Sequence, residues 1–255
     1  MKATENPGSA QSPASAVILC NGEFPRKEYP LYLLRSADII ICCDSARNVD
    51  RLARLGLTPS LIVGDMDSTP ARIQKEFAPR IVKVHEQDDN DLAKAFSLLR
   101  ERYPEVIDIH ILGAGGKNEA HTVGNLGWLL EWECRSLAET GLGLAARGIS
   151  VDMVSDWSTA FAVSPSNPAT SLGSAPSPEP GCNLSAAPLD LYVGEGRRIS
   201  FFATDPQLRI KSQGLQWPLD GVDLSRWWCA TLNRATSDTV TLAFNHPAPL
   251  LIILD

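Results

Sequence analysis

Short apolar runs that alternate with segments of helical spacing constrain the fold more than any other feature of this sequence. Segments between the runs, such as 91–103, repeat apolar residues three and four positions apart, as the covering helices of a sheet do. Strands buried on both faces and separated by helices belong to a parallel sheet, so we expect an open parallel α/β domain over residues 16–155. The expected strands are 16–20, 38–43, 60–63, 80–84, 106–112 and 149–154.

The chain changes character after this domain. Residues 164–188 hold six prolines and six serines with Glu179 as the single charged residue, a composition that predicts a loop or linker. Strand-favouring runs separated by glycine turns follow over residues 189–255 and predict a smaller C-terminal β-sandwich domain. Residues 1–15 are expected to form a flexible tail. The predicted fold class is therefore α/β followed by all-β.

The charge balance excludes some classes of partner. The chain carries 23 Lys and Arg against 30 Asp and Glu, a net charge of -7, and contains no block rich in Lys or Arg. We therefore expect neither nucleic acid nor a membrane as partner, since both need a cationic surface, and a small molecule or a protein fits better. No apolar run reaches the roughly 18 residues of a membrane span, and residues 1–16 lack a secretion signal. A cytoplasmic location with reduced cysteines is the expectation.

An acidic cluster follows the expected strand 60–63. Residues 64–68 read Gly-Asp-Met-Asp-Ser and lie where a parallel sheet keeps its ligands, at the carboxyl end of a strand. Asp65 and Asp67 point the same way if the backbone is extended, and two carboxylates about 4 Å apart repel by roughly 4 kcal/mol at an effective dielectric of 20. A bound Mg²⁺ relieves that repulsion. The alternative is a solvated turn in which one aspartate caps the next helix.

A second acidic cluster occupies residues 86–91, between an expected strand and an expected helix. Asp88 and Asp91 are three positions apart at the helix start and share a face. Capping explains one or two acidic residues in a first helical turn, and four carboxylates in six residues exceed that need. The two clusters together predict a Mg²⁺ site, because Mg²⁺ prefers carboxylates, water and phosphates. Its expected ligands are Asp65, Asp67, Asp88 and Asp91.

A glycine-rich turn spans residues 113–125, between an expected strand and an apolar helix. Such a turn exposes backbone N–H groups at a helix N-terminus, where a phosphate group binds well, and Lys117 adds a positive charge. The pattern matches neither common nucleotide-binding fingerprint. The alternative is a tight connection with His121 as an ordinary capping or surface residue.

Tryptophans gather in the C-terminal region. Trp217, Trp227 and Trp228 lie within twelve positions, and an aromatic face can stack on a flat cationic heterocycle. The commoner role of a tryptophan is packing. Trp227 and Trp228 cannot both face the core of a strand, so one of them is expected to face solvent or an interface.

These motifs occur in the order typical of the thiamine pyrophosphokinase family, which the sequence resembles from residue 17 to residue 254. The family carries G-D-x-D-S, Q-D-x-[TN]-D, a glycine-rich turn that ends in His and Asn, G-L-x-[YW]-P-L and T-x-N. Here these motifs are residues 64–68, 87–91, 113–125, 214–219 and 231–233.

The resemblance implies that the chain transfers a pyrophosphoryl group from ATP to the hydroxyl of thiamine, giving thiamine diphosphate and AMP. It implies catalytic, Mg²⁺-binding carboxylates at the four aspartates named above, stacking of Trp217 on thiamine, and hydrogen bonds from Thr231 and Asn233. It also implies a homodimer, in which the β domain of one subunit faces the α/β domain of the other across a shared site. The implied contacts to ATP and its phosphates are Asp44, Gly64, Ser68, Gly113, Ala114, Gly116, Lys117, His121 and Asn125.

The sequence departs from the family within the glycine-rich turn, which usually runs G-A-x-G-[GK]-R-x-D-H. Asn118 stands at the arginine position and Ala120 at the aspartate position. An arginine binds phosphate through two N–H groups and an asparagine does not, so Lys117 carries the charge alone. The alternative function is therefore a weakened or inactive homologue that binds nucleotide or thiamine as a sensor or structural dimer. A nicotinamide-dependent oxidoreductase is disfavoured because no dinucleotide fingerprint follows residues 16–20.

Overall fold

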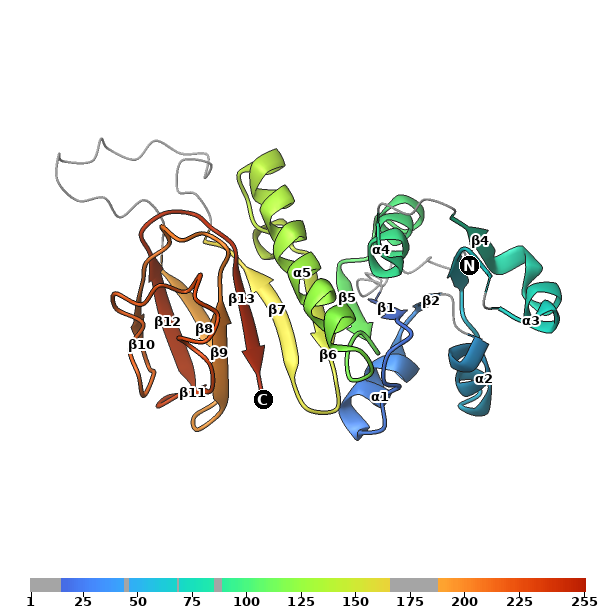
Figure 1. Ribbon diagram of the computed structural model, residues 1–255, viewed down its shortest axis with the longest axis horizontal. Helices are drawn as coiled ribbons and strands as arrows, with labels where there is room; N and C mark the ends of the chain where they lie inside the picture. Colours follow the sequence, from blue (N-terminus) through green and yellow to red (C-terminus); the bar gives the residue numbers. More distant parts are fainter. Residues whose placement is uncertain (1–14, 44–45, 68, 85–88, 166–187) are drawn as a thin grey trace, which may run out of the picture.

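One long β-sheet is the central element of the fold. A computed structural model describes residues 15–43, 46–67, 69–84, 89–165 and 188–255. The described residues form a ten-stranded sheet and a three-stranded sheet that lies against one end of it (Figure 1). The order of strands in the long sheet is β11-β9-β13-β7-β6-β5-β1-β2-β3-β4.

The N-terminal part of this sheet is parallel. All six expected strands form, and their order β4-β3-β2-β1-β5-β6 reverses direction between β1 and β5. In an open α/β sheet such a reversal opens a crevice at the carboxyl ends of the two strands. The bounds are β1 (Ser15–Leu19), β2 (Ile39–Cys43), β3 (Leu61–Gly64), β4 (Ile81–Lys83), β5 (Asp108–Leu112) and β6 (Ser150–Val154).

Helices cover both faces of the parallel part, as alternation along β1 shows. Ile18 packs with α4 and α5, whereas Val17 packs with α1, α2 and α3. Successive strand residues point to opposite faces, so an apolar strand needs helices on both sides. No helix within the described residues is long and apolar enough to cross a membrane. The helices are α1 (Glu28–Ser36), α2 (Ala46–Arg54), α3 (Ala71–Glu76), α4 (Asp91–Arg102) and α5 (Glu119–Thr140), with short 3-10 turns η1 (Ala78–Arg80) and η2 (Ala145–Arg147).

The C-terminal strands extend the same sheet. β7 (Thr159–Val163), which the sequence analysis did not anticipate, returns antiparallel to β6 and pairs with β13 (Leu250–Leu254). β9 (Arg198–Phe202) and β11 (Asn233–Arg234) complete this end. The separate sheet consists of β8 (Leu189–Tyr192), β10 (Ile210–Gln213) and β12 (Thr239–Phe244) in the order β10-β12-β8.

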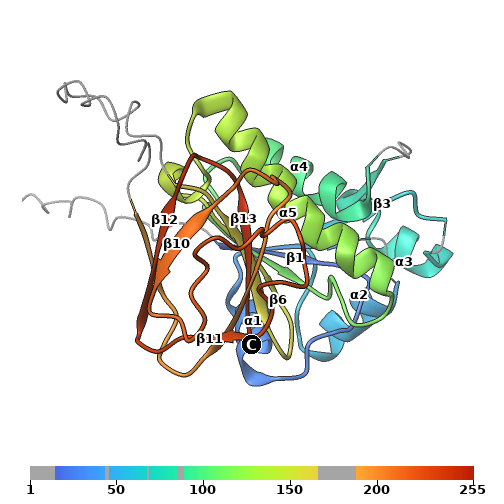
Figure 2. The same cartoon turned by 60° about the vertical axis from the view of Figure 1, so that its left-hand side comes forward.

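The two sheets pack face to face at this end and form the expected β-sandwich (Figure 2). Phe201 and Ile252 from the long sheet share a buried cluster with Val240 and Phe244 from the short one. The sandwich therefore uses the end of the long sheet as one of its layers. The domain boundaries drawn from the sequence stay a prediction, and residues 1–14 and 166–187 lie outside the described residues.

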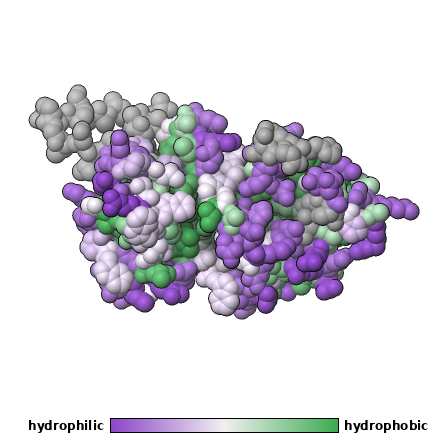
Figure 3. All heavy atoms as spheres, in the orientation of Figure 1, coloured by the Kyte–Doolittle hydropathy of each residue, from purple (hydrophilic) through white to green (hydrophobic). Residues whose placement is uncertain are grey.

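The surface differs between the two ends of the molecule. Figure 3 shows apolar side chains reaching the surface towards the middle, whereas the end that holds α2 and α3 is mostly hydrophilic. Leu251 of β13 is buried in the same cluster as residues of α4 and α5, with Phe202 and Trp227 packed against it. Apolar packing therefore joins the sandwich to the α/β part.

Candidate functional site

A cavity of about 590 Å³ opens at the carboxyl ends of β1, β2, β3 and β5. Its walls come from the turns that follow these strands and from the first turns of α4 and α5. The cavity thus lies at the point where the strand order reverses, and its volume is that of a typical small-molecule site.

Many of the residues predicted from the sequence meet at this cavity. Asp44, Ser68 and Asp88 lie outside the described residues. Gly64 is the last residue of β3 and directly precedes Asp65. Asp67 is exposed, and its backbone N–H donates to Asp65 Oδ1 at 3.0 Å. The predicted residues that line the cavity are Asp65, Asp91, Gly113, Ala114, Lys117, His121 and Asn125.

The acidic side of the cavity is built at the start of α4. Asn90 is the N-cap of this helix, and its side-chain oxygen accepts from the backbone N–H of Ala93 at 2.9 Å. Asp89 and Asp91 line the cavity, and neither of them makes the cap. Among the described residues no three His, Cys, Asp or Glu side chains converge as a metal site. The N-cap of α4 is thus Asn90, and Asp91 lies in the first turn, where the helix dipole also favours a carboxylate.

The glycine-rich side depends on a close approach of two turns. Gly22 N–H donates to Gly113 O at 2.6 Å, and Glu23 N–H donates to Gly115 O at 2.8 Å. A Cβ at Gly113 would lie 2.7 Å from Cys20 O, and Gly113 has a φ of +65°. Only glycine is compatible with both restrictions. Gly22 was not among the predicted site residues, although the Asn21-Gly22 pair after a strand is a turn signal.

The N-terminus of α5 opens onto the glycine-rich side. Asn118 is its N-cap and accepts from the backbone N–H of His121 at 3.2 Å. Lys117 Nζ donates to Asn21 O at 3.2 Å, which holds the lysine at the cavity wall. A helix of 22 residues presents partial positive charge at this end and favours an anion there. Asn118, which departs from the family pattern, thus has a capping role, and Ala120 is exposed in the first turn.

One buried amide links the two sides of the cavity. Asn125 Nδ2 donates to Ala114 O at 2.8 Å, and Asn125 Oδ1 accepts from Asn90 Nδ2 at 3.3 Å. Asn125 is 8% exposed; its contact to Ala114 is buried, and its contact to the exposed Asn90 is partly buried. The glycine-rich turn and the start of α4 are therefore fixed relative to each other through this side chain.

The residues expected to bind thiamine lie on the β-sandwich, and none of them lines the cavity. Asn233 is buried, accepts from Trp217 N–H at 3.2 Å and donates to Trp217 O at 2.6 Å. Its amide therefore clamps the backbone of Trp217, whose side chain is 56% exposed. Thr231 is also exposed.

The two neighbouring tryptophans differ in exposure, as expected from the sequence. Trp228 is exposed, whereas Trp227 packs against Phe202 and donates from Nε1 to Ala203 O at 2.8 Å. They lie in a turn rather than in a strand, because β11 begins only at Asn233.

Two family models match this chain. The model described as the thiamin pyrophosphokinase catalytic domain matches residues 31–138, and that of the thiamin pyrophosphokinase substrate-binding domain matches residues 189–247. The chain belongs to the thiamine pyrophosphokinase family. A comparison with curated protein sequences finds no match.

Solved structures of thiamine pyrophosphokinases share the fold. The enzyme from Geobacillus thermodenitrificans is 18% identical, with a TM-score of 0.66 over 94% of this chain and 97% of that one. The Bacillus subtilis enzyme is 19% identical, with a TM-score of 0.65 over 94% and 98%. The yeast enzyme is 16% identical, with a TM-score of 0.66 over 98% and 88%.

The two thiamine pyrophosphokinase models divide the predicted site residues between them. Asp65, Asp91 and the glycine-rich turn fall within the catalytic-domain match, and Trp217 and Asn233 fall within the substrate-binding match. This division coincides with the cavity on one side and the exposed sandwich surface on the other.

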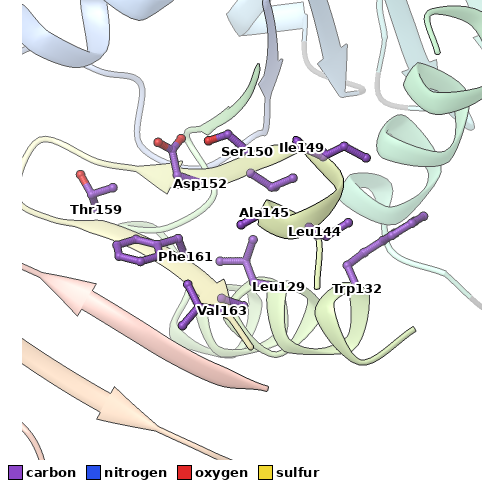
Figure 4. Close-up of a pocket in the computed structure, with 13 residues that line it drawn as sticks. Leu129, Trp132, Leu144, Ala145, Ile149, Ser150, Asp152, Thr159, Phe161 and Val163 are labelled. Atoms are coloured by element: carbon purple, nitrogen blue, oxygen red, sulfur yellow. The ribbon is translucent and has the colours of Figure 1, made fainter. Parts of the chain in front are cut away.

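A second cavity, of about 380 Å³, lies between β6, β7 and α5 (Figure 4). β6 and β7 pair only over Asp152–Val154 and Thr159–Phe161, and the strands diverge beyond this register. Apolar side chains such as Trp132 and Phe161 line the gap, with the Asp152 carboxylate at one end. None of the predicted site residues lines it.

Proposed function

We propose that this protein is a thiamine pyrophosphokinase that transfers the pyrophosphoryl group of ATP to the hydroxyl of thiamine, giving thiamine diphosphate and AMP. The cavity at the strand reversal carries the proposal, because the α5 N-terminus and the carboxylates of Asp65 and Asp91 line it together. Such a site offers both anion-binding N–H groups and metal-binding oxygens to a triphosphate.

The glycine-rich side is the proposed phosphate site. Gly113 and Gly116 both have positive φ values, which allow the tight turn that places the backbone of Gly113, Ala114 and Gly115 at the cavity wall. Lys117 adds a point charge and the α5 N-terminus adds its dipole. Catalysis then rests mainly on positioning and charge neutralisation, as is usual for phosphoryl transfer.

The acidic side fits a magnesium ion. Mg²⁺ in phosphate-transfer sites is held by one or two carboxylates together with water and substrate phosphates, and Asp65 and Asp91 supply two carboxylates at the cavity wall. Asp67 and Asp88 are the further proposed ligands. When bound, Mg²⁺ neutralises negative charge on the triphosphate. Because Asn90 makes the cap of α4, the Asp91 carboxylate is not required there and is proposed to hold the ion.

The exposed surface of the sandwich is the proposed thiamine site. Trp217 presents an exposed ring whose backbone is clamped by Asn233, and Thr231 lies exposed nearby in sequence. An exposed indole on a backbone that is held in place suits stacking on the cationic thiazolium ring. Because none of these residues lines the nucleotide cavity of the same chain, we infer a homodimer in which each cavity faces the sandwich of the other subunit.

The test is a product assay on the purified full chain with ATP, Mg²⁺ and thiamine. Equal amounts of AMP and thiamine diphosphate are expected, and Asp91→Asn is expected to abolish both. Glu101→Gln is the matched control, since it changes an exposed carboxylate at the opposite end of the same helix. A folded wild-type protein that forms neither product would overturn the proposal.

A weakened homologue is the second candidate, and the turn residues Asn118 and Ala120 favour it. The double variant Asn118→Arg with Ala120→Asp restores the family pattern, although loss of the asparagine cap costs about 1 kcal/mol of helix stability. A large rise in turnover from a near-zero wild-type rate supports this candidate. If the wild type turns over substrate and the double variant is equally fast or slower, the result supports an active enzyme in which Asn118 is a cap.

A further inference from the structure

Two buried cysteines lie side by side at the floor of the nucleotide cavity. Cys43 ends β2, and Cys20 directly follows β1. The parallel register pairs Leu19 with Cys42, so the next positions, Cys20 and Cys43, are also neighbours. Their Sγ atoms are 4.0 Å apart.

The backbone at this place suits a disulfide. Neighbouring strands lie roughly 4.7–4.9 Å apart. That spacing falls inside the range of about 4.4–6.8 Å that joins the Cα atoms of bonded cysteines. Only the two sulfur atoms have to approach, from 4.0 Å to a bonding distance of about 2.0 Å.

The other described cysteines are placed differently. Cys42 points to the opposite face of the sheet and is buried against α1 and α2. Cys134 and Cys229 are exposed. Cys20 and Cys43 are buried and both are among the residues that line the cavity, so this pair is the one that a small reagent in the cavity approaches.

We propose that Cys20 and Cys43 are a dithiol modification site that a low-molecular-weight disulfide oxidises to an intramolecular disulfide. The Cys20 thiolate attacks the small disulfide RSSR, forming a Cys20–SR mixed disulfide and releasing one RS⁻. Cys43 Sγ then attacks Cys20 Sγ and forms the Cys20–Cys43 bond, while the thiol proton passes to the departing sulfur and the second RSH leaves. The protein loses two hydrogens and two electrons, and RSSR becomes two RSH.

The bond would alter the acidic side of the cavity. The Cys43 thiol donates to Asp91 O at 3.6 Å, at the first residue of α4. Bonding to Cys20 draws Cys43 Sγ away from this carbonyl. On the Cys20 side, the Asn48 amide donates to Cys20 O at 2.7 Å and holds the backbone in place. The shift on oxidation therefore affects the contact between Cys43 Sγ and Asp91 O. We expect oxidation to weaken nucleotide binding several-fold. This consequence rests on the proposed function.

Mass spectrometry of the full chain tests the site itself. The protein is incubated with oxidised glutathione, digested and mapped, and a peptide that joins Cys20 to Cys43 is expected, reversible by dithiothreitol. Cys134→Ser, at an exposed thiol, is expected to keep the cross-link, whereas Cys43→Ser is expected to give only a mixed disulfide at Cys20. Circular dichroism establishes that each variant is folded. The proposal is overturned if Cys20 and Cys43 stay free thiols while the exposed cysteines become fully glutathionylated.

Titration of ATP with Mg²⁺ against the reduced and oxidised wild-type protein tests the consequence. A several-fold higher Kd for the oxidised form supports it, and equal affinities overturn it. The mapped cross-link is read without any activity. A failure of the proposed enzymatic function is therefore seen separately, as a reduced protein that forms no product.

Discussion

Asn90 Nδ2 donates to Asn125 Oδ1 at 3.3 Å, and this contact joins the acidic and the glycine-rich sides of the proposed nucleotide cavity. Asn90 at the same time caps α4, and Asn125 at the same time holds Ala114 O. The two asparagines therefore set the spacing between the carboxylates proposed to bind the metal and the turn proposed to bind phosphate.

The first prediction concerns this spacing. Asn90→Ser keeps a good N-cap oxygen but removes the amide that reaches Asn125, so stability is expected to change little. kcat/KM for ATP is expected to fall about ten- to hundredfold, because catalysis by positioning is sensitive to small displacements. Steady-state kinetics and urea unfolding measure the two quantities.

Asn125→Ala is the companion variant. It leaves Ala114 O without its buried partner and is expected to cost roughly 1–3 kcal/mol of stability in addition to activity. The double variant is expected to lose less activity than the sum of the single losses, because both act through one contact. Strict additivity in the double variant would show that the contact does not position the site.

The parallel part of the fold was predictable from the sequence because its strands are apolar on both faces. β1 and β2 are buried along nearly their whole length, and each expected strand lies within two residues of the observed one. β7 was missed because its run Thr159–Val163 is short and only partly buried, so it lacks the continuous apolar pattern of β1 and β2. Only pairing with β6 and β13 makes it a strand.

The candidate site was predictable in its residue types but not in its contacts. The carboxylates and the glycine-rich turn follow strand ends, and the position of a strand end is visible in the sequence. The role of Asn118 as a cap depends on where α5 begins, so the sequence shows only the missing arginine. The neighbourhood of Cys20 and Cys43 depends on strand register, which no local pattern specifies.

The second prediction concerns the exposed indole of the sandwich. Trp217→Ala is expected to raise KM for thiamine by roughly tenfold, since a cation–π contact with a bound ligand contributes about 1–2 kcal/mol. KM for ATP is expected to stay unchanged, and Trp217→Phe is expected to recover most of the affinity. Trp228→Ala is the control, because that side chain is also exposed but has no proposed ligand contact. An equal effect of both alanine variants would argue against stacking at Trp217.

The third prediction concerns the shared site of the proposed homodimer. Asp91→Asn damages the cavity and Trp217→Ala damages the thiamine surface, so a mixed dimer has one site with both lesions and one intact site. Random exchange of subunits is expected to restore about a quarter of the wild-type sites at low thiamine concentration. Activity that stays at the average of the two parent variants after subunit exchange would show that each chain builds its site alone.

The fourth prediction concerns His110, a buried residue of β5. His110 Nδ1 lies 2.8 Å from Asp152 Oδ1, and Nε2 lies 3.4 Å from Asp108 Oδ2. Burial by itself lowers the pKa of His110. The hydrogen bond to Asp152 and the charges of Asp152 and Asp108 outweigh burial and raise the pKa above the ordinary value of 6.5.

The raised pKa makes the contribution of His110 to stability depend on pH. A group whose pKa is higher in the folded state stabilises fully below its unfolded pKa, and the contribution is lost as pH rises through the folded pKa. The stability difference between wild type and His110→Gln is therefore expected to be larger at pH about 5.5 than at pH about 8.5. Urea unfolding at the two pH values measures it. In an Asp152→Asn background the pH dependence is expected to shrink, because Asp152 supplies both the hydrogen bond and the nearest charge. A difference that is constant across this pH range would show that the pair is not charged in the folded protein.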